Sequence, residues 1–491
     1  MNLQEQVVAW LAQQDLDAYL VGGCVRDPWL GREVHDLDVV VAGDGLRLSR
    51  RLADRFRGGF YPLDDLRRTG RAILHESREA PPLVVDVAQF RGPDLAADLA
   101  DRDFTINALA IDVRFPGTII DHHDGLTDLS RGLIRPVSPD SIRNDPLRAM
   151  RAVRLAAQLD FELTVETIAA IRRDGAGLVE VSGERVRDEL VQLLFLPSAS
   201  RSLEILQELG LLFLVLPELV PLQGLAQTAP HHLDVFEHTL ETLHALEIIL
   251  AGLDPELDYS QDVDIPSLSG LDRYAARIRA HLSELLTDCR SRGVALKLAA
   301  LLHDVGKPDA FECDSEGRNR FFGHEKGSAR IAALALRRLC FSGDEVRVVE
   351  TVVRNHMRPL LLAEQPEVTR RAVYRFFRAT GDAGVDVILH SLADHRATYA
   401  PGTGEREWLQ LLSVAVRMLE DYWEYQPERV NPPILVNGHD LMSEFNLSPG
   451  PQIGDLLEAV REAQADDQVR TREEAMALVQ SLLGTSHGNH R

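Results

Sequence analysis

The stretch that decides the fold of the first part of the chain is YLVGGCVRDPWLGREVHDLDVVV, residues 19–41. An apolar run ends in Gly22 and Gly23, a helix-start pattern carrying Arg26 follows, and a second apolar run opens at Asp36. Apolar runs of this length with a Gly-Gly turn between them are typical of strands in an α/β domain. The stretch therefore predicts a strand, a glycine turn, a short helix and a second strand.

Two aspartates lie inside the second strand pattern, at Asp36 and Asp38. Aspartate is unfavourable in strands, and strand periodicity puts both carboxylates on one face while Leu37 and Val39 point the other way. Two carboxylates on one rigid face can share divalent cations, as two-metal nucleotidyl transfer requires. Asp36 and Asp38 are therefore the predicted catalytic metal ligands.

The glycine turn suits phosphate binding. Gly22 and Gly23 let backbone N–H groups approach phosphate oxygens, and Arg26 can neutralise their charge. The alternative is coincidence, since the chain has 76 acidic residues and repeats the Asp-x-Asp spacing at 262–264. That second copy lies in a polar stretch without a preceding glycine turn, so we expect a solvated loop there.

A third acidic residue, Asp86, stands alone in the apolar run VVDVAQF at 84–90. A carboxylate in an apolar strand is costly unless it binds a metal or pairs with a cation. Two interpretations remain open: Asp86 joins the catalytic metal site, or it pairs with an arginine such as Arg91.

The composition describes a soluble globular protein with several domains. The 491 residues are 45% hydrophobic and 26% charged, with a net charge of −23. This acidity argues against binding long nucleic acid by bulk electrostatics. Lysine occurs only at 297, 307 and 326, so arginine supplies nearly all of the positive charge, much of it before residue 190. A locally basic cleft for a compact RNA is one explanation, and an arginine-biased genome is the other.

Cysteine usage and hydropathy indicate a cytoplasmic protein. The four cysteines are scattered, which argues against a disulfide framework and against a thiolate zinc site. No export signal or membrane span is expected from the apolar runs.

Strand-like runs alternate with helical patterns up to about residue 135, and helical periodicity dominates from Pro136 onward. The expected strand regions are 18–23, 36–43, 71–76, 82–90 and 118–125. The fold class is therefore a mixed α/β head followed by an all-α part.

Three further segments give the chain a specific resemblance. They are RDFTINALAID (102–112), DHHDGLTDLSRGLIRPV (121–137) and RNDPLRAMRAVRLAAQL (143–159). In order and spacing, together with the earlier Gly-Gly and Asp-x-Asp blocks, they resemble the motifs of class II tRNA nucleotidyltransferases and bacterial poly(A) polymerases. The resemblance implies a polymerase-β-type nucleotidyltransferase head, with a tRNA 3′ end, CTP and ATP as partners.

The resemblance also implies roles for individual residues. It assigns Mg²⁺ to Asp36 and Asp38, phosphate or ribose contacts to Gly23, Arg26 and Arg102, base reading to Asp145 and Arg148, and the triphosphate side to Arg151 and Arg154. The spacing agrees, because residues 148, 151 and 154 share one face of a helix that Asp145 precedes. The alternative is an amphipathic helix with a solvated arginine face.

Two departures bear on the subfamily. Asn144 stands where related enzymes usually carry glutamate, which keeps an acceptor and loses a charge. Only residues 92–101 separate Arg91 from Arg102, where enzymes that add the complete CCA typically have a longer flexible loop. The short connection resembles enzymes that add only CC.

A second constellation lies in the helical part. Its members are His238, His303, Asp304, His324, His356 and Asp394. An adjacent His-Asp pair at the end of an apolar helix needs partners, and a divalent transition metal or Mg²⁺ would supply them. The set resembles the ligands of HD-superfamily phosphohydrolases, in the same order. Hydrolysis of a phosphomonoester or cyclic phosphate, with Lys307 near the phosphate, follows as a hypothesis.

The expected organisation has four parts: a catalytic head at 1–135, a nucleotide-selecting and RNA-binding neck at 136–224, an HD domain at 225–400 and a helical tail at 401–491. The expected activity is addition of C, as CC or CCA, to tRNA 3′ ends. The alternatives are a poly(A) polymerase or A-adding enzyme, and an HD phosphohydrolase. The oligomeric state is left open.

Overall fold

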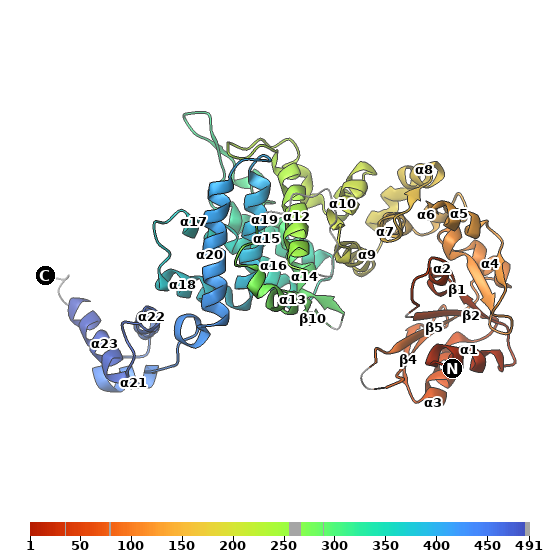
Figure 1. The fold of residues 1–491 in the computed structure, drawn as a ribbon, viewed down its shortest axis with the longest axis horizontal. Coiled ribbons are helices and arrows are strands. Elements are labelled where there is room, and N and C mark those ends of the chain that lie inside the picture. Colours follow the sequence, from red (N-terminus) through yellow and green to blue (C-terminus); the bar gives the residue numbers. More distant parts are fainter. Residues whose placement is uncertain (35, 78–79, 255–266, 288, 487–491) are drawn as a thin grey trace. The chain divides into compact units, whose positions relative to one another are not determined.

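The chain forms two compact units (Figure 1). The first comprises Met1–Leu196 and Glu204–Val215, and the second comprises Pro197–Leu203 and Leu216–Arg491. The computed structural model describes residues 1–34, 36–77, 80–254, 267–287 and 289–486. The Asp-x-Asp copy at 262–264, expected to be a solvated loop, lies outside the described residues.

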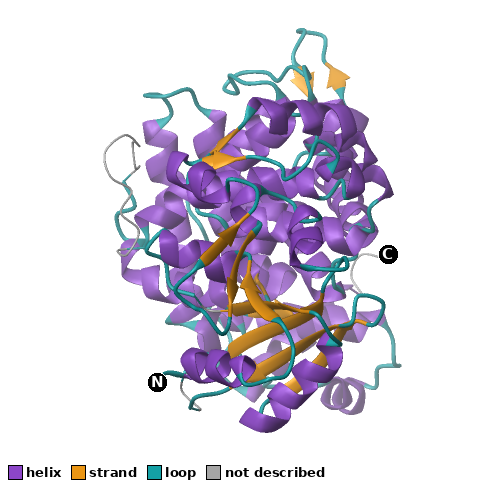
Figure 2. Ribbon diagram, turned by 90° about the vertical axis from the view of Figure 1, so that its right-hand side faces the viewer, coloured by secondary structure: helices purple, strands orange, loops and turns teal. Residues whose placement is uncertain are grey.

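A seven-stranded mixed sheet forms the centre of the first unit, in the order β3-β4-β5-β2-β1-β6-β7. The strands are β1 (Ala18–Val21), β2 (Asp36–Val41), β3 (Gly59–Asp64), β4 (Thr69–Leu74), β5 (Leu83–Gln89), β6 (Leu109–Asp112) and β7 (Ile119–Asp121). Strands β2 and β5 run parallel, and the other neighbours are antiparallel. All five expected strand regions form strands, and β3 and β6 add to them. Figure 2 shows these strands in orange, side by side.

Helices cover the sheet and continue beyond it. They are α1 (Leu3–Ala12), α2 (Gly23–Trp29), α3 (Gly45–Phe56), α4 (Leu95–Ala100), α5 (Gly125–Arg131), α6 (Ser141–Asn144), α7 (Arg148–Leu159), α8 (Val165–Asp174), α9 (Gly183–Phe195) and α11 (Leu212–Val215). Helix α3 begins where the Asp44 carboxylate accepts a hydrogen bond from the Arg47 N–H. Its Leu48 and Leu52 are buried at helical spacing and hold it against β4 and β5.

The second unit is a helical bundle with a small terminal module. Its elements are α12 (Val235–Gly252), α13 (Ala275–Ser283), α14 (Arg292–Leu302), α15 (His324–Arg338), α16 (Gly343–Asn355), α17 (Met357–Ala363), α18 (Arg370–Thr380), α19 (Gly384–Thr398), α20 (Glu405–Trp423), α21 (Gly438–Phe445), α22 (Pro451–Ala465) and α23 (Arg472–Ser486). Helix α10 (Ala199–Glu208) contributes its first residues to this unit. Almost every residue of α19 is buried, because α12, α14, α16 and α20 pack around it. This central helix carries part of the predicted metal site.

The terminal helices α21, α22 and α23 share a separate apolar core. Its buried members include Leu441, Leu456, Val460 and Val479. The predicted fold class, an α/β head followed by a helical remainder, is confirmed. Short strand pairs add to it: β8 (Leu133–Ile134) with β9 (Glu162–Leu163), β10 (Leu285–Thr287) with β11 (Arg290–Ser291), and β12 (Glu312–Cys313) with β13 (Asn319–Arg320).

Candidate active site and metal centre

The three predicted catalytic aspartates lie on two adjacent parallel strands. In β2, Leu37 and Val39 are buried while Asp36 and Asp38 are exposed, so the two carboxylates occupy the same face as expected. Strands β2 and β5 pair with Asp38 directly beside Asp86. The pairing therefore brings the three acidic side chains to one face of the sheet.

Asp86 pairs with Arg71, not with Arg91. The Arg71 guanidinium donates from Nε and Nη2 to the two Asp86 oxygens at 2.8 Å each. Arg71 is the antiparallel neighbour of Asp86 on β4, so sheet register creates the pair. Arg91 turns away and contacts Asp101, with an Nη1 to Oδ2 distance of 3.4 Å. The arginine partner proposed from sequence was thus the wrong one.

The environment of Asp38 favours cation binding. Its pKa is raised to about 6, because the surrounding protein takes the carboxylate partly out of water and because Asp86 and Asp36 carry like charge nearby. Gly22, at a φ of +72°, holds the turn beside it. A Cβ at that position would lie 3.5 Å from Asp38 Oδ2 and 3.5 Å from Arg102 Nη1. The Gly22 turn, the Asp38 carboxylate and the Arg102 guanidinium are therefore close neighbours.

Arg26 and Arg102 are held by side chains around the turn. Arg26 is buried and donates from Nη1 to Asn107 Oδ1 at 2.7 Å and from Nε to Asp27 Oδ1 at 2.7 Å. Arg102 donates from Nε and Nη2 to Asp98 Oδ2 at 3.2 and 3.1 Å. Both predicted phosphate-binding arginines are therefore held in fixed orientations around the glycine turn.

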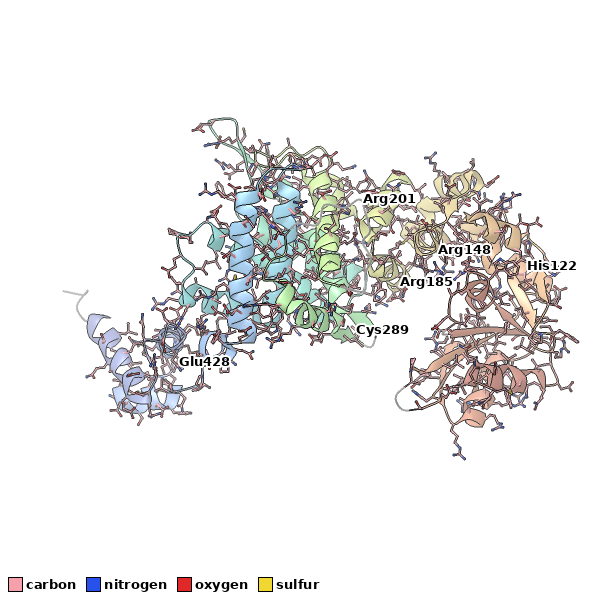
Figure 3. All side chains as sticks on the ribbon, in the orientation of Figure 1. His122, Arg148, Arg185, Arg201, Cys289 and Glu428 are labelled. Carbon is pink, nitrogen blue, oxygen red and sulfur yellow. The ribbon has the colours of Figure 1, made fainter. Side chains whose placement is uncertain are left out.

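The two predicted base-reading side chains have different hydrogen-bond partners in the structure. The Asp145 carboxylate accepts from Arg185 Nη2 at 2.7 Å. Arg148 instead donates to backbone oxygens: from Nη2 to Asp101 at 2.7 Å and from Nη1 to Arg102 at 3.2 Å. In Figure 3, Arg148 and Arg185 are labelled on α7 and α9. Arg185 was not anticipated from sequence.

Arg151 and Arg154 share one buried partner, Glu189 of α9. Arg151 Nε donates to Glu189 Oε1 at 3.0 Å, and Arg154 Nε donates to Oε2 at 2.8 Å. Arg151 also forms an ion pair with Asp103 at 3.2 Å. These two arginines lie on the same helix face, as expected from their spacing. Because they are paired with a buried carboxylate, they do not form the solvated arginine face that was the alternative.

A cleft of about 1350 Å³ collects these residues within the first unit. Its lining includes Gly22, Gly23, Arg26, Asp36, Asp38, Arg102, Asp145, Arg148, Arg151, Arg154 and Arg185. Asp86, whose carboxylate pairs with Arg71, is not among the lining residues. Mainly arginine and aspartate line the cleft, so it can hold a polyphosphate and divalent cations together.

The six residues of the second constellation converge within the helical unit. His238 lies on α12, His303 and Asp304 follow α14, His324 opens α15, His356 follows α16, and Asp394 lies on α19. His238 Nε2 lies 3.0 Å from Asp394 Oδ1, and Asp304 lies 3.0 Å from His303 and 3.2 Å from His324. All six are buried. The predicted set therefore forms one cluster.

Three of these histidines are oriented by the same kind of hydrogen bond, from the ring Nδ1 to a backbone carbonyl. The Nδ1 atoms of His303, His324 and His356 lie 2.9, 2.8 and 2.7 Å from the carbonyl oxygens of Ala300, Phe321 and Val353, each three residues earlier. An imidazole that donates from Nδ1 presents an unprotonated Nε2, the form that binds metal. Burial lowers the pKa of His356 to about 4, which also favours the neutral ring.

The buried polar atoms of the cluster fit a divalent metal. His303 Nε2 and His324 Nε2 are buried and lie 3.0 and 3.2 Å from the Asp304 carboxylate, whose Oδ2 is 2.7 Å from Lys307 Nζ. Single donor atoms of His238, His303 and Asp304 lie within 4.8 Å of one another, as do those of Asp304, His324 and His356. Such groups are costly to bury unless something binds them. Mixed imidazole and carboxylate donors suit transition metals.

Sequence reasoning missed His390 at this centre, whereas it anticipated Lys307. His390, one helical turn before Asp394 on α19, is fully buried with its ring centre 5.0 Å from that of His303. Lys307 Nζ lies 2.7 Å from Asp304 Oδ2 and donates to Gln227 Oε1 at 2.6 Å. A cavity of about 780 Å³ opens onto the cluster, with Lys307, Arg320, Phe321 and Tyr399 in its lining.

Family models match four segments of the chain. They are the Poly A polymerase head domain (18–135), the "Probable RNA and SrmB- binding site of polymerase A" (160–222), the HD domain (235–396) and the tRNA nucleotidyltransferase domain 2 (405–479). Among the described residues, no helix has the length and apolar character needed to cross a membrane.

Curated relatives match along nearly the full length. The A-adding tRNA nucleotidyltransferase of Deinococcus radiodurans is 36% identical over 480 residues, covering 96% of this chain and 97% of that protein. The CC-adding tRNA nucleotidyltransferase of Thermus thermophilus is 35% identical, covering 94% and 93%. Among solved structures, the Thermotoga maritima CCA-adding enzyme complexed with tRNA has a similar fold, with a TM-score of 0.59 at 20% identity, covering 98% of this chain and 95% of that one.

The aspartate-bearing mixed sheet, the glycine turn and the arginine-lined cleft define a nucleotidyltransferase head, and the histidine cluster defines an HD domain. Both domain types use divalent metal ions. The chain belongs to the family of tRNA nucleotidyltransferases and poly(A) polymerases, enzymes of tRNA processing.

Proposed function

We propose that this protein adds C to tRNA 3′ ends, transferring CMP from CTP with release of pyrophosphate, and that it stops at CC. The observation that carries the CC specificity is helix α4, which fills the short connection between Arg91 and Arg102. Asp94 caps the helix by accepting from the Ala97 N–H at 2.9 Å. Buried Asp98 holds both ends of this connection, because its carboxylate accepts hydrogen bonds from the Arg91 N–H and from the Arg102 guanidinium. A tied helix leaves no long flexible loop at this place.

In this mechanism Asp36, Asp38 and Asp86 form the acidic face toward which the 3′ hydroxyl is directed. Bound there, Mg²⁺ would lower the pKa of the attacking hydroxyl and steady the leaving pyrophosphate. Gly22, Gly23, Arg26 and Arg102 bind and orient the triphosphate. Asp145 and Arg148 select the base, and Arg151 and Arg154 neutralise phosphate charge.

We assign catalysis to residues 1–135, nucleotide selection and RNA binding to 136–224, the metal-dependent HD domain to 225–400 and a supporting tail to 401–491. The acidic chain bears a local arginine-rich cleft, which suits the compact 3′ end of a tRNA. A substrate of this kind places the protein in the cytoplasm.

The test is single-nucleotide extension of tRNA ending at the discriminator base, at C or at CC, with Mg²⁺ and each nucleotide in turn. CTP should extend the first substrate by two residues, and ATP should not extend the third. Asp36→Ala and Asp38→Ala should each lower kcat at least about 100-fold, since the metal ligands are lost. Asp54→Ala, which removes an exposed aspartate on α3, is the matched control.

A different result changes the assignment. Extension of the CC-ending substrate by ATP alone would make the protein an A-adding enzyme, as the name of the Deinococcus radiodurans relative suggests. Sequential addition of C, C and A would contradict the role given to α4. If no nucleotide is incorporated, phosphate-ester hydrolysis at the HD centre becomes the leading hypothesis for the function.

A second function, metal-dependent hydrolysis of phosphate esters, is favoured by the buried donors around Asp304 and by Lys307 beside them. The substrate class would be a phosphomonoester or a 2′,3′-cyclic phosphate. Purified protein should bind Mn²⁺, Ni²⁺ or Mg²⁺, and His303→Ala should lose that metal without changing CTP incorporation. A His303→Ala variant with full metal content would rule out this centre.

A further inference from the structure

Helix α9 presents two charged side chains to the predicted nucleotide-binding residues. Arg185 and Glu189 are four residues apart, so they lie on the same helical face. Arg185 contacts Asp145, and Glu189 contacts Arg151 and Arg154. Helices α7 and α9 pack together, and Figure 3 labels one arginine on each. One helix face therefore engages three of the four residues to which base selection and phosphate binding are assigned.

Asp145 is held at both carboxylate oxygens. It sits in extended backbone between α6 and α7. The Leu147 N–H donates to its Oδ1 at 3.3 Å, and Arg185 Nη2 donates to its Oδ2 at 2.7 Å. The first bond is local and long, so Arg185 supplies the stronger constraint on the direction of the carboxylate.

Arg148 does not supply this constraint. Its side chain is 6% exposed, and its Nη1 and Nη2 atoms donate to the backbone oxygens of residues 101, 102 and 141 and to the Ser141 hydroxyl. These bonds fix Arg148 against the segment that follows α4. The orientation of Asp145 is thus set by a helix, α9, that lies outside the motif containing both residues.

Glu189 fixes two arginines with one carboxylate. It is 8% exposed and is not part of the cleft lining, so it acts from behind Arg151 and Arg154. Each of its oxygens accepts from the Nε of one arginine, at 3.0 and 2.8 Å. Arg151 Nη1 also donates to Asp103 and Arg154 Nη1 to Gln158, so Nη2 is the terminal nitrogen of each arginine that is left for the cleft.

We propose that the Arg185 and Glu189 face of α9 is a positioning element for nucleotide selection. Arg185 holds the Asp145 carboxylate where it accepts from the exocyclic amine of an incoming base, and Glu189 holds Arg151 and Arg154 where they meet the triphosphate. This rests on the proposed function. A carboxylate free to rotate would lose the fixed geometry that discriminates a base amine from a base carbonyl.

The test compares Arg185→Gln, Arg185→Lys and Glu189→Gln with the unaltered protein, using kcat and KM for each of the four nucleotides. Arg185→Gln should lower the preference for CTP over UTP roughly 10- to 100-fold, as expected for loss of a charge-assisted hydrogen bond. Arg185→Lys should restore part of that preference. Glu189→Gln should raise KM for CTP roughly 10-fold with a smaller effect on the base preference.

Coupling through Asp145 gives the decisive readout. If Arg185 acts by holding Asp145, then Asp145→Asn combined with Arg185→Gln should have the same base preference as Asp145→Asn alone. The controls are Arg173→Gln and Asp188→Asn, which remove ion-paired side chains outside the cleft lining. Both should keep the full base preference.

Unchanged base preference in Arg185→Gln, or fully additive effects in the double variant, would overturn the proposal while the transferase assignment stands. An unaltered protein that incorporates no nucleotide would overturn the proposed function, and this inference with it. Thermal unfolding of every variant is measured in parallel. If Arg185→Gln is unfolded, the comparison rests on Arg185→Lys.

Discussion

Asp103 is the residue that joins the side chains around the glycine turn to Arg151 of α7. It is 8% exposed, accepts from Asn107 Nδ2 at 3.1 Å and pairs with Arg151 at 3.2 Å. Asn107 in turn accepts from Arg26. Burial alone would raise the pKa of Asp103, but the charge of Arg151 and these hydrogen bonds outweigh it, so the pKa is lowered.

Replacing this residue tests the linkage between charge and stability. Asp103→Asn should destabilise the first unit by about 3 kcal/mol at neutral pH, because Arg151 loses a buried partner. Because the pKa of Asp103 is lower in the folded state than in the unfolded state, the ionised carboxylate stabilises the folded protein. This stabilisation is complete above the unfolded-state pKa of about 4 and is lost as the pH falls through the folded-state pKa. The difference in Tm between the two proteins should therefore be full at pH 7 and shrink below about pH 4. A difference that grows on acidification would contradict the pairing.

Single residues also mark what sequence could predict. That Asp36 and Asp38 share one strand face was predictable, because two aspartates in a strand pattern after a glycine turn depart from ordinary strand composition. Arg71, Arg185, Glu189 and His390 were not, because their roles depend on sheet register or helix packing between distant segments. The only sequence indication for α9 was that Arg185 and Glu189 are four residues apart. Such a pair also occurs on helices that face solvent, so it did not point to a functional site.

At the scale of elements, the HD centre depends on a close approach between two helices. Gly306, after α14, donates its N–H to Ser328 Oγ at 2.8 Å. A Cβ at Gly306 would lie 2.4 Å from the Ser328 backbone nitrogen and 2.8 Å from the His324 carbonyl oxygen. Only glycine lets the His303-Asp304 segment lie directly against the first turns of α15, where His324 begins the helix.

Gly306→Ala should therefore separate Asp304 from His324. We expect a loss of about 2 kcal/mol in the free energy of unfolding from overpacking, and a fall in bound metal per chain. Equilibrium dialysis with Mn²⁺ or Ni²⁺ measures the metal. The matched control is Gly343→Ala at the start of α16, where an added Cβ meets no atom within 4 Å. Equal metal content in both variants would refute this account.

Elements were predicted unevenly. Long periodic helices such as α7 and α9, and the strands carrying aspartates, followed from hydrophobic spacing. Strands β3 and β6 did not, since β3 (GFYPLD) includes a proline and has no buried residue, and β6 (LAID) is short. Their place in the sheet is decided by pairing with β4 and β1, which is tertiary information.

The whole molecule consists of two units, each of which contains one of the two candidate sites. Apolar clusters lie within single units, such as Val21, Val40 and Leu99 in the first and Leu441, Leu456 and Val460 in the second. Compact regions with separate cores commonly unfold as separate cooperative steps. Ligands specific to one unit should therefore stabilise that unit alone.

Differential scanning calorimetry should resolve two transitions. Ni²⁺ or Mn²⁺ at about 100 times its Kd should raise one of them by about 5 °C or more, and CTP with Mg²⁺ should raise the other. His303→Ala should abolish only the first shift, and Asp38→Ala only the second. A single transition that moves with both ligands would mean that the two units unfold together.

The parallel pairing of β2 with β5 has a consequence for how this chain can change over generations. Asp38 and Asp86 lie side by side only while the two strands keep their pairing register. Asp36 shares their face only because it is two residues away from Asp38. Point substitutions on the edge strand β3, none of whose residues is buried, leave the pairing of β2 with β5 intact. Gain or loss of a single codon between Asp36 and Val41 would instead turn the carboxylates into the apolar layer, so length variation in this head should be confined to its loops.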